Sequence, residues 1–295
     1  MMLLNASGCL DALIAPDVAR SLDGFVTKTI TPLPREGNEP VRIAETDVGM
    51  LNSIGLANPG RDRFLAEVLP RLGELGVPIW VSVGGFSAAD YADTCASLGR
   101  DEVAARVAAV ELNLSCPNVD EAPESAAEIV AACRAATGLP LYAKLSPALP
   151  DVAEVALAVR AAGADGLSLV NTIRGLKLEP TTLEPVLGRG AGGLSGPALK
   201  PIALAAVYSC FRATGLPIVG MGGVASGGDA LDLIAAGASA VALGTVLFSD
   251  PEAPGRIRAE LASELALRDL RDASEAHGLA HRQHSPRRTA AEVWS

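Results

Sequence analysis

The chain has 295 residues, of which 49% are hydrophobic and 3% aromatic, and its formal net charge at pH 7 is −10. This length and hydrophobic content suffice for one large α/β domain with a mainly aliphatic core. The acidic balance argues against broad nucleic-acid binding, and no apolar run reaches the roughly 18 residues of a membrane span.

Eight β-rich runs alternate with helical patterns along the chain. The predicted strands cover residues 2–6, 24–30, 78–84, 108–115, 140–146, 166–172, 217–223 and 240–246. The predicted helices lie near residues 15–22, 61–75, 87–98, 123–137, 151–162, 198–214, 227–236 and 252–269. Eight β-then-α units predict an α/β fold of the (β/α)8 TIM-barrel type, with a doubly wound open sheet as the alternative.

Two connections, residues 31–60 and 173–197, are much longer than the others. Both follow the carboxyl ends of strands, where barrel sites are built, so we interpret them as loops that cover a ligand. Composition shows no break, so residues 1–270 are predicted to form a single domain. We interpret residues 271–295 as a polar, loosely ordered tail in which His277 and His281 are solvated rather than metal-binding.

The cysteines are odd in number and form no CxxC pair; they are Cys9, Cys95, Cys116, Cys133 and Cys210. This pattern argues against a disulfide framework, a zinc site and an iron–sulfur site, so no metal site is predicted. It suits a reducing compartment, and the N-terminus has no signal-peptide pattern, so a cytoplasmic location is expected. The first 276 residues contain no histidine, so an acid–base group there is expected to be Cys, Lys, Asp, Glu or Tyr.

Each predicted strand ends in glycine or a polar side chain, and in a barrel these ends share one rim. After the last two strands come Gly222, Gly223, Gly244 and Thr245. Glycine lets backbone N–H groups approach an anion closely, so these positions suit a phosphate group. Ordinary turn glycines are the alternative interpretation.

Two lysines, Lys28 and Lys144, end the second and fifth predicted strands. A lysine among strand residues is rarely explained by packing. Such a cation can stabilise a reduced flavin or an anionic substrate. A lysine that forms a Schiff base, or one that snorkels to the rim, are the alternatives.

Four carboxamides are predicted at the same rim, on Asn52, Asn113, Asn118 and Asn171. They suit a ligand with alternating C=O and N–H groups, such as a pyrimidine ring, although each alone fits a turn or a cap. Cys116 follows a strand and precedes a proline. With no histidine nearby it is a candidate general base, if a cation such as that of Lys28 favours its thiolate; a buried apolar cysteine is the alternative.

Together the motifs ASGC, VTKTIT, GMLNSIGL, ELNLSCPNV, AKLSP, LVNTIRG, GGLSGPALKPIAL and PIVGMGGV resemble the class 1 dihydroorotate dehydrogenases, most closely the subclass 1B catalytic subunit. The resemblance covers about residues 5–250. It implies an FMN-bearing (β/α)8 barrel that oxidises dihydroorotate to orotate in pyrimidine (UMP) biosynthesis. It also implies a homodimer, and a partner subunit with FAD and a [2Fe–2S] cluster that completes a heterotetramer and passes electrons to NAD⁺. Fumarate, which subclass 1A uses, is the other acceptor considered.

The resemblance also assigns roles to residues. Cys116 matches the catalytic base, which takes the C5 proton while the C6 hydride passes to FMN N5. The positions that match substrate contacts are Lys28, Asn52, Ile54, Gly55, Leu56, Asn113, Asn118, Asn171 and Thr172. The positions that match flavin contacts are Ser7, Gly8, Lys28, Thr29, Ser82, Asn113, Lys144, Val170, Gly196, Gly222, Gly223, Gly244 and Thr245. Ser82 replaces an asparagine that many members have.

Three other functions stay open. The first is a flavin oxidoreductase acting on another dihydropyrimidine. The second is a Schiff-base aldolase that uses Lys144. The third is a catalytically weak family member that mainly binds a partner protein.

Overall fold

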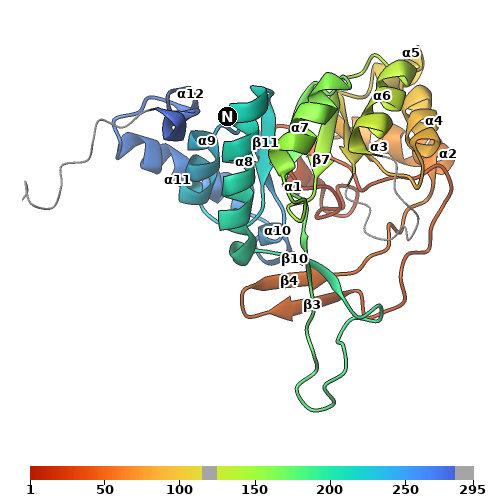
Figure 1. The fold of residues 1–295 in the computed structure, drawn as a ribbon, viewed down its shortest axis with the longest axis horizontal. Helices are drawn as coiled ribbons and strands as arrows, with labels where there is room; N and C mark the ends of the chain where they lie inside the picture. Colours follow the sequence, from red (N-terminus) through yellow and green to blue (C-terminus); the bar gives the residue numbers. More distant parts are fainter. Residues whose placement is uncertain (115–124, 283–295) are drawn as a thin grey trace, which may run out of the picture.

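Eight parallel strands form the centre of the molecule (Figure 1). The structure is a computed structural model, and it describes residues 1–114 and 125–282. In their order around the sheet the strands are β1 (Met2–Asn5), β12 (Ala240–Leu243), β11 (Ile218–Met221), β8 (Gly166–Leu169), β7 (Leu141–Leu145), β6 (Ala109–Asn113), β5 (Ile79–Val83) and β2 (Phe25–Val26). Each of them lies within a predicted range.

A buried asparagine joins the two ends of this order. The Asn5 side chain donates from Nδ2 to the Val26 carbonyl and accepts at Oδ1 from the Val26 N–H, each over 2.8 Å. These two bonds stand where ladder hydrogen bonds between β1 and β2 would be, so the backbone groups of Val26 stay paired. The sheet is thereby closed into a barrel, and the alternative of an open sheet is wrong.

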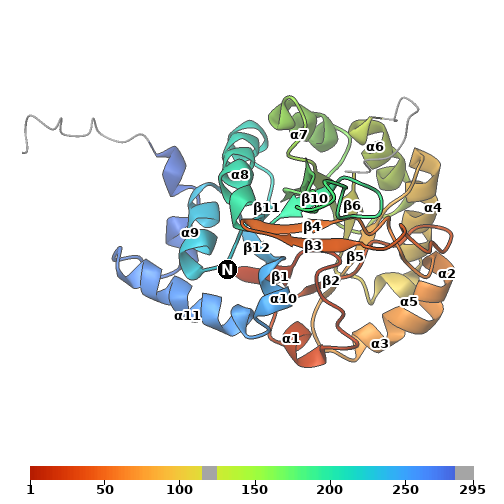
Figure 2. The ribbon, with the colours of Figure 1, turned by 90° about the horizontal axis from the view of Figure 1, so that it is seen from below.

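Helices surround the barrel on the outside (Figure 2). The α-helices of five or more residues are α1 (Pro16–Arg20), α3 (Leu69–Gly73), α4 (Ala88–Leu98), α6 (Ala126–Ala136), α7 (Val152–Ala161), α8 (Lys200–Thr214), α9 (Gly227–Ala235) and α11 (Ala253–Ala266). The other helical pieces are α2 (Arg61–Arg63), the π-helical η1 (Phe64–Val68), α5 (Asp101–Ala104), η2 (Pro197–Leu199), α10 (Val246–Ser249), α12 (Ala273–Ala276) and η3 (Leu279–His281). None of the helices in the described part of the chain is long and apolar enough to cross a bilayer.

Alternation along the strands divides the core in two. One set of strand side chains packs outward against the helices in the larger cluster, for example Leu3, Leu112 and Leu167. The other set forms a smaller cluster, which includes Leu4 and Trp80. The residues of this smaller cluster come from strands all around the sheet, so they fill the interior of the barrel.

Parts of the two long connections, which were expected to be loops, form a second sheet. Its strands, in order, are β3 (Ile43–Thr46), β4 (Gly49–Asn52), β10 (Gly192–Ser195) and β9 (Ile173–Gly175). All of its pairs are antiparallel, and Asn52 lies opposite Ile43 on one side and Gly193 on the other. In Figure 2 the strands β3 and β4 lie across the end of the barrel.

The beginning of the C-terminal region is packed against the barrel, so the expectation of solvated histidines is wrong. His277 Nε2 donates to the Gly237 carbonyl over 3.1 Å, and His281 Nε2 donates to the Ala236 carbonyl over 2.8 Å. The His281 ring also stacks on Tyr208 of α8, with the ring centroids 4.1 Å apart. The polar composition of this region did not predict the packing. A histidine can pack through its aromatic face and also donate a hydrogen bond, so a polar segment can still be partly buried.

Candidate active site

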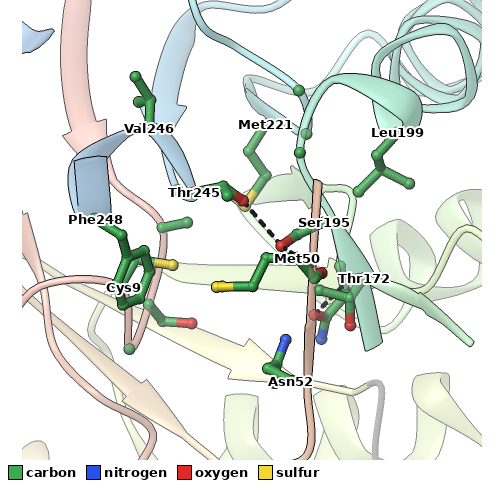
Figure 3. A pocket seen from close by; sticks show the side chains of 18 of the residues that line it. Cys9, Met50, Asn52, Thr172, Ser195, Leu199, Met221, Thr245, Val246 and Phe248 are labelled. Atoms are coloured by element: carbon green, nitrogen blue, oxygen red, sulfur yellow. Dashed lines mark hydrogen bonds between the residues drawn. The ribbon is translucent and has the colours of Figure 1, made fainter. Parts of the chain in front are cut away.

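A cavity of about 580 Å³ opens where the carboxyl ends of the barrel strands meet the four-stranded sheet (Figure 3). Most residues predicted to bind substrate or cofactor line it. They are Ser7, Gly8, Lys28, Thr29, Asn52, Ile54, Leu56, Asn113, Lys144, Val170, Asn171, Thr172, Gly196, Gly222, Gly223, Gly244 and Thr245. The barrel rim and the second sheet therefore build one site together.

The remaining predicted residues are placed differently. Gly55 and Ser82 are not in the lining. Ser82 is fully buried, and its hydroxyl lies 2.9 Å from that of Thr29, so Ser82 supports a lining residue from behind. Cys116 and Asn118 lie outside the described residues.

A chain of side-chain hydrogen bonds orients the polar groups of the rim. Asn171 Nδ2 donates to Asn113 Oδ1 over 3.1 Å, and Asn113 Nδ2 donates to Thr29 Oγ1 over 3.2 Å. From the second sheet, Asn52 Nδ2 donates to the Gly193 carbonyl over 3.2 Å. An amide NH2 has two hydrogens, so each carboxamide has an N–H left beyond these bonds. The rim can therefore present fixed donors to a ring with carbonyl groups.

An ion pair forms the floor beneath this rim. Lys144 Nζ lies 3.3 Å from Glu111 Oε1 and donates to Ser7 Oγ over 2.8 Å. The side chain of Lys144 is 5% exposed and that of Glu111 is 1% exposed. An ammonium group is thus held at the base of the cavity in surroundings where charges act strongly.

The second lysine stands at the side of the cavity. Partial burial lowers the pKa of Lys28, although its side chain lines the open cavity. Close to it, burial raises the pKa of the Cys9 thiol. Cys9 is therefore a neutral thiol near pH 7 and a weak base.

Glycines shape the end of the cavity next to β11 and β12. Gly222 and Gly223 have φ values of 118° and 76°, which favour glycine. A Cβ atom on Gly244 would have Cys9 Sγ and Ala6 Cβ as its nearest neighbours, both 3.6 Å away, so the backbone there is open to a ligand. Thr245 Oγ1 donates to Ser195 Oγ over 2.9 Å and so ties this end to the second sheet (Figure 3).

Comparison with known proteins decides the family. A family model described as dihydroorotate dehydrogenase matches residues 2–265. The chain belongs to the dihydroorotate dehydrogenase family. It is 45% identical to the protein named "Dihydroorotate dehydrogenase B (NAD(+)), catalytic subunit" of Latilactobacillus sakei subsp. sakei (strain 23K), over 92% of this chain and 91% of the relative. It is 42% identical to the protein of the same name from Desulforudis audaxviator (strain MP104C), over 88% and 86% of the two chains.

Solved structures agree on the fold. Dihydroorotate dehydrogenase from Eimeria tenella in complex with ferulenol superposes with a TM-score of 0.80, at 24% identity over 96% of this chain and 86% of that one. The ligand-free form of that protein gives a TM-score of 0.78, at 24% identity over 95% and 89%. The predicted TIM barrel and the predicted resemblance to subclass 1B are both confirmed.

Several residues that line the cavity of this dihydroorotate dehydrogenase homologue were not predicted. The sulfur-containing and aromatic ones are Cys9, Met50, Met221 and Phe248. Cys9 was within reach of sequence reasoning, because it follows Ser7 and Gly8 at the end of the first strand. Phe248 was not, because it lies in the short helix α10, whose position over the cavity depends on the tertiary fold (Figure 3).

Proposed function

We propose that this chain oxidises (S)-dihydroorotate to orotate in pyrimidine biosynthesis, with FMN bound in the cavity. One observation carries the proposal: two lysines, a series of hydrogen-bonded carboxamides and a glycine-lined end occur together in one cavity. The chain that contains this cavity belongs to the dihydroorotate dehydrogenase family. Its relatives are catalytic subunits that are named for this activity and for NAD⁺.

The residues present suit FMN. A Cβ atom built on Gly8 would have the Lys28 side chain as its nearest neighbour, 4.0 Å away, and Gly244 is similarly open, so the two leave room for a bulky group. Gly222, Gly223 and Thr245 would hold a phosphate group through backbone N–H groups and a hydroxyl. Lys144 would lie at the part of the flavin where reduction builds negative charge. When bound, FMN supplies the acceptor for a hydride.

The carboxamides would hold and orient the substrate ring. Asn52, Asn113 and Asn171 carry N–H donors in positions fixed by their bonds to Gly193, Thr29 and each other. Lys28 would attract the carboxylate of dihydroorotate, with Thr172 and the segment at residues 54–56 beside it. Donors that are already fixed hold the bound substrate in its reactive orientation. Less entropy is then lost on the way to the transition state, so the reaction is faster.

We assign the proton transfer to Cys116. Its thiolate would take the proton from C5, and the neutral thiol would later release it to solvent. Cys9 also lines the cavity, but burial raises its pKa, so little of it is thiolate near pH 7. Asn118 would complete the set of carboxamides.

The aldolase interpretation fits the site less well. A Schiff-base lysine must present a neutral amine. Lys144 is instead paired with the Glu111 carboxylate in the barrel interior. Borohydride trapping of a carbonyl substrate on Lys144 would support the aldolase.

We further propose a partner subunit that carries FAD and a [2Fe–2S] cluster and passes electrons to NAD⁺, in a heterotetramer built on a homodimer of this chain. The support is the name "catalytic subunit" shared by the relatives. We propose that residues 1–270, together with the packed segment that follows up to His281, form a single domain. We also propose a cytoplasmic location, since the described cysteines, Cys9, Cys95, Cys133 and Cys210, are all free thiols.

The direct test is an anaerobic half-reaction. The purified chain is expected to show flavin absorbance, and L-dihydroorotate is expected to bleach it, while dihydrouracil at the same concentration leaves it unchanged. A yellow protein bleached only by dihydrouracil would move the assignment to another dihydropyrimidine. A chain that binds no FMN after reconstitution would overturn the proposal.

A further inference from the structure

The ion pair below the cavity contains a carboxylate that the proposed reaction does not use. Glu111 is absent from the cavity lining, whereas Lys144 and its hydrogen-bond partner Ser7 both belong to it. The Glu111 carboxylate is 3.3 Å from Lys144 Nζ, and its side chain is 1% exposed. Among the hydrogen bonds and ion pairs of the described residues, Glu111 therefore meets the cavity lining through Lys144.

The strand geometry places this pair below the substrate groups. Side chains two residues apart on a strand share one face, so Glu111 and Asn113 of β6 both point into the barrel. Asn113 is opposite Lys144 in the register of β6 and β7. One strand thus presents a carboxamide at the rim and a carboxylate one layer deeper.

Stability alone is a poor explanation for the pair. Removing two charges from water is costly, and a buried ion pair is often no more stabilising than apolar residues of similar volume. β6 and β7 are already joined by four register pairs, from Val110 to Asn113. A carboxylate in this position is therefore better explained by its action on the lysine.

We propose that Glu111 is a positioning residue that sets the reduction potential of the bound flavin through Lys144. This inference rests on the proposed function, because it requires FMN in the cavity. Glu111 fixes the ammonium group at the cavity floor and balances its charge. Lys28, Lys144 and Glu111 together carry one net positive charge, and loss of the carboxylate raises this to two.

The sign of the effect follows from electrostatics. A more positive floor stabilises the negative charge that reduction places on the flavin. Glu111→Gln is therefore expected to make the midpoint potential more positive, and Lys144→Met to make it more negative. At a fixed potential we expect at least a tenfold change in the ratio of reduced to oxidised flavin, which is about 30 mV for a two-electron couple.

A double mutant separates action through Lys144 from direct action. In Lys144→Met the cation through which Glu111 is proposed to act is absent. Adding Glu111→Gln to Lys144→Met is then expected to shift the potential by less than Glu111→Gln does alone. A shift in the double mutant as large as that of Glu111→Gln alone would show that Glu111 acts on the flavin directly and would overturn the proposal.

The experiment is a reductive titration of the FMN-loaded chain with dithionite and a reference dye, together with FMN affinity from fluorescence quenching. Ser168→Ala is the matched control: Ser168 is fully buried, lies opposite Lys144 in the register, and its Oγ has no hydrogen-bond partner among the described residues. It is expected to keep the wild-type potential. Glu111→Asp keeps the negative charge and is expected to have a midpoint potential close to the wild-type value.

Each outcome decides the proposal. A Glu111→Gln chain that binds FMN with a potential at or below the wild-type value overturns it. If Glu111→Gln holds no FMN, Lys144→Met decides instead, and a potential at or above the wild-type value there is contrary to the proposal. Dihydroorotate is not needed, so these results do not depend on the substrate. A wild-type chain without FMN affinity overturns the proposed function along with this inference.

Discussion

The barrel and the four-stranded sheet follow different rules of assembly. Seven of the eight neighbouring pairs in the barrel are made by ladders between parallel strands, mostly in sequence order. The second sheet instead joins residues about 140 positions apart, since Asn52 pairs with Gly193. The barrel strands are largely buried, whereas Ile43 of β3 and Leu176 after β9 are exposed. The barrel is thus a buried base, and the four-stranded sheet is a more exposed cover.

This difference suggests a division of labour in the cavity. The barrel supplies Lys144, Asn113 and the glycines proposed to hold FMN. The sheet supplies Asn52 and, through Gly193, the surroundings of Thr172, both proposed to hold substrate. Substitutions in the barrel should therefore change the rate of flavin reduction, the FMN affinity or the free energy of unfolding. Substitutions in the four-stranded sheet should change kcat/KM for the substrate.

The largest effect is expected in the connection that follows β6. Cys116→Ala removes the proposed base and should lower kcat by about 10²–10⁴-fold, which is typical of a lost general base. FMN affinity should not change, because the barrel supplies the flavin contacts. Stopped-flow measurement of flavin reduction by dihydroorotate tests this. Near-normal reduction would refute the role of Cys116.

Next in size is the stability of the barrel. Leu167 of β8 is fully buried, so Leu167→Ala should lower the free energy of unfolding by about 2–5 kcal/mol. Leu183, in the connection between β9 and β10, is 68% exposed. Leu183→Ala should change this free energy by no more than about 0.5 kcal/mol. Urea unfolding followed by circular dichroism compares the two, and equal losses would contradict the distinction between base and cover.

A change in the sheet should act on the substrate alone. A Cβ atom on Gly193 would stand 2.1 Å from Thr172 Oγ1, so Gly193→Ala must displace that side chain. Misplacing a substrate contact by about 1 Å can cost about 10²-fold in kcat/KM. Steady-state kinetics and FMN affinity are the measurements. Gly138→Ala, which has no atoms within 4 Å of the added Cβ, is the control; weakened FMN binding in Gly193→Ala would contradict the division.

The smallest effect is a pH dependence from Lys28. Its pKa is lowered by burial, so the ammonium loses its proton below the ordinary lysine value of about 10.4. Orotate is an anion, and its binding should weaken as the pH rises through the pKa of Lys28, by about tenfold or less, or 1.4 kcal/mol. Lys28→Arg keeps the charge and should remove this dependence. Spectral titration with orotate from pH 7 to 10 tests it, and equal pH profiles would exclude Lys28.

The sequence predicted the barrel well, because its signals are local. Apolar runs mark the strands, and side-chain caps begin several helices, as Ser226 does before α9, where its Oγ accepts the Asp229 N–H over 3.2 Å. The predicted rim followed, since the ends of parallel strands in a barrel must meet. The second sheet escaped prediction because its strands pair across the two long connections, with partners far away in the chain. His277 and His281 were misjudged because their contacts are also non-local.

By itself, the sequence determined the family, the eight βα units and the set of polar groups at the strand ends, since motifs and alternation are carried by neighbouring residues. Only the tertiary structure decided that Asn5 closes the barrel, that Ser82 lies behind Thr29, and that Glu111 pairs with Lys144 beneath the cavity. These facts depend on which side chains face each other across strands. Sequence distance does not determine such contacts, because barrel closure and strand register bring together residues that are far apart in the chain.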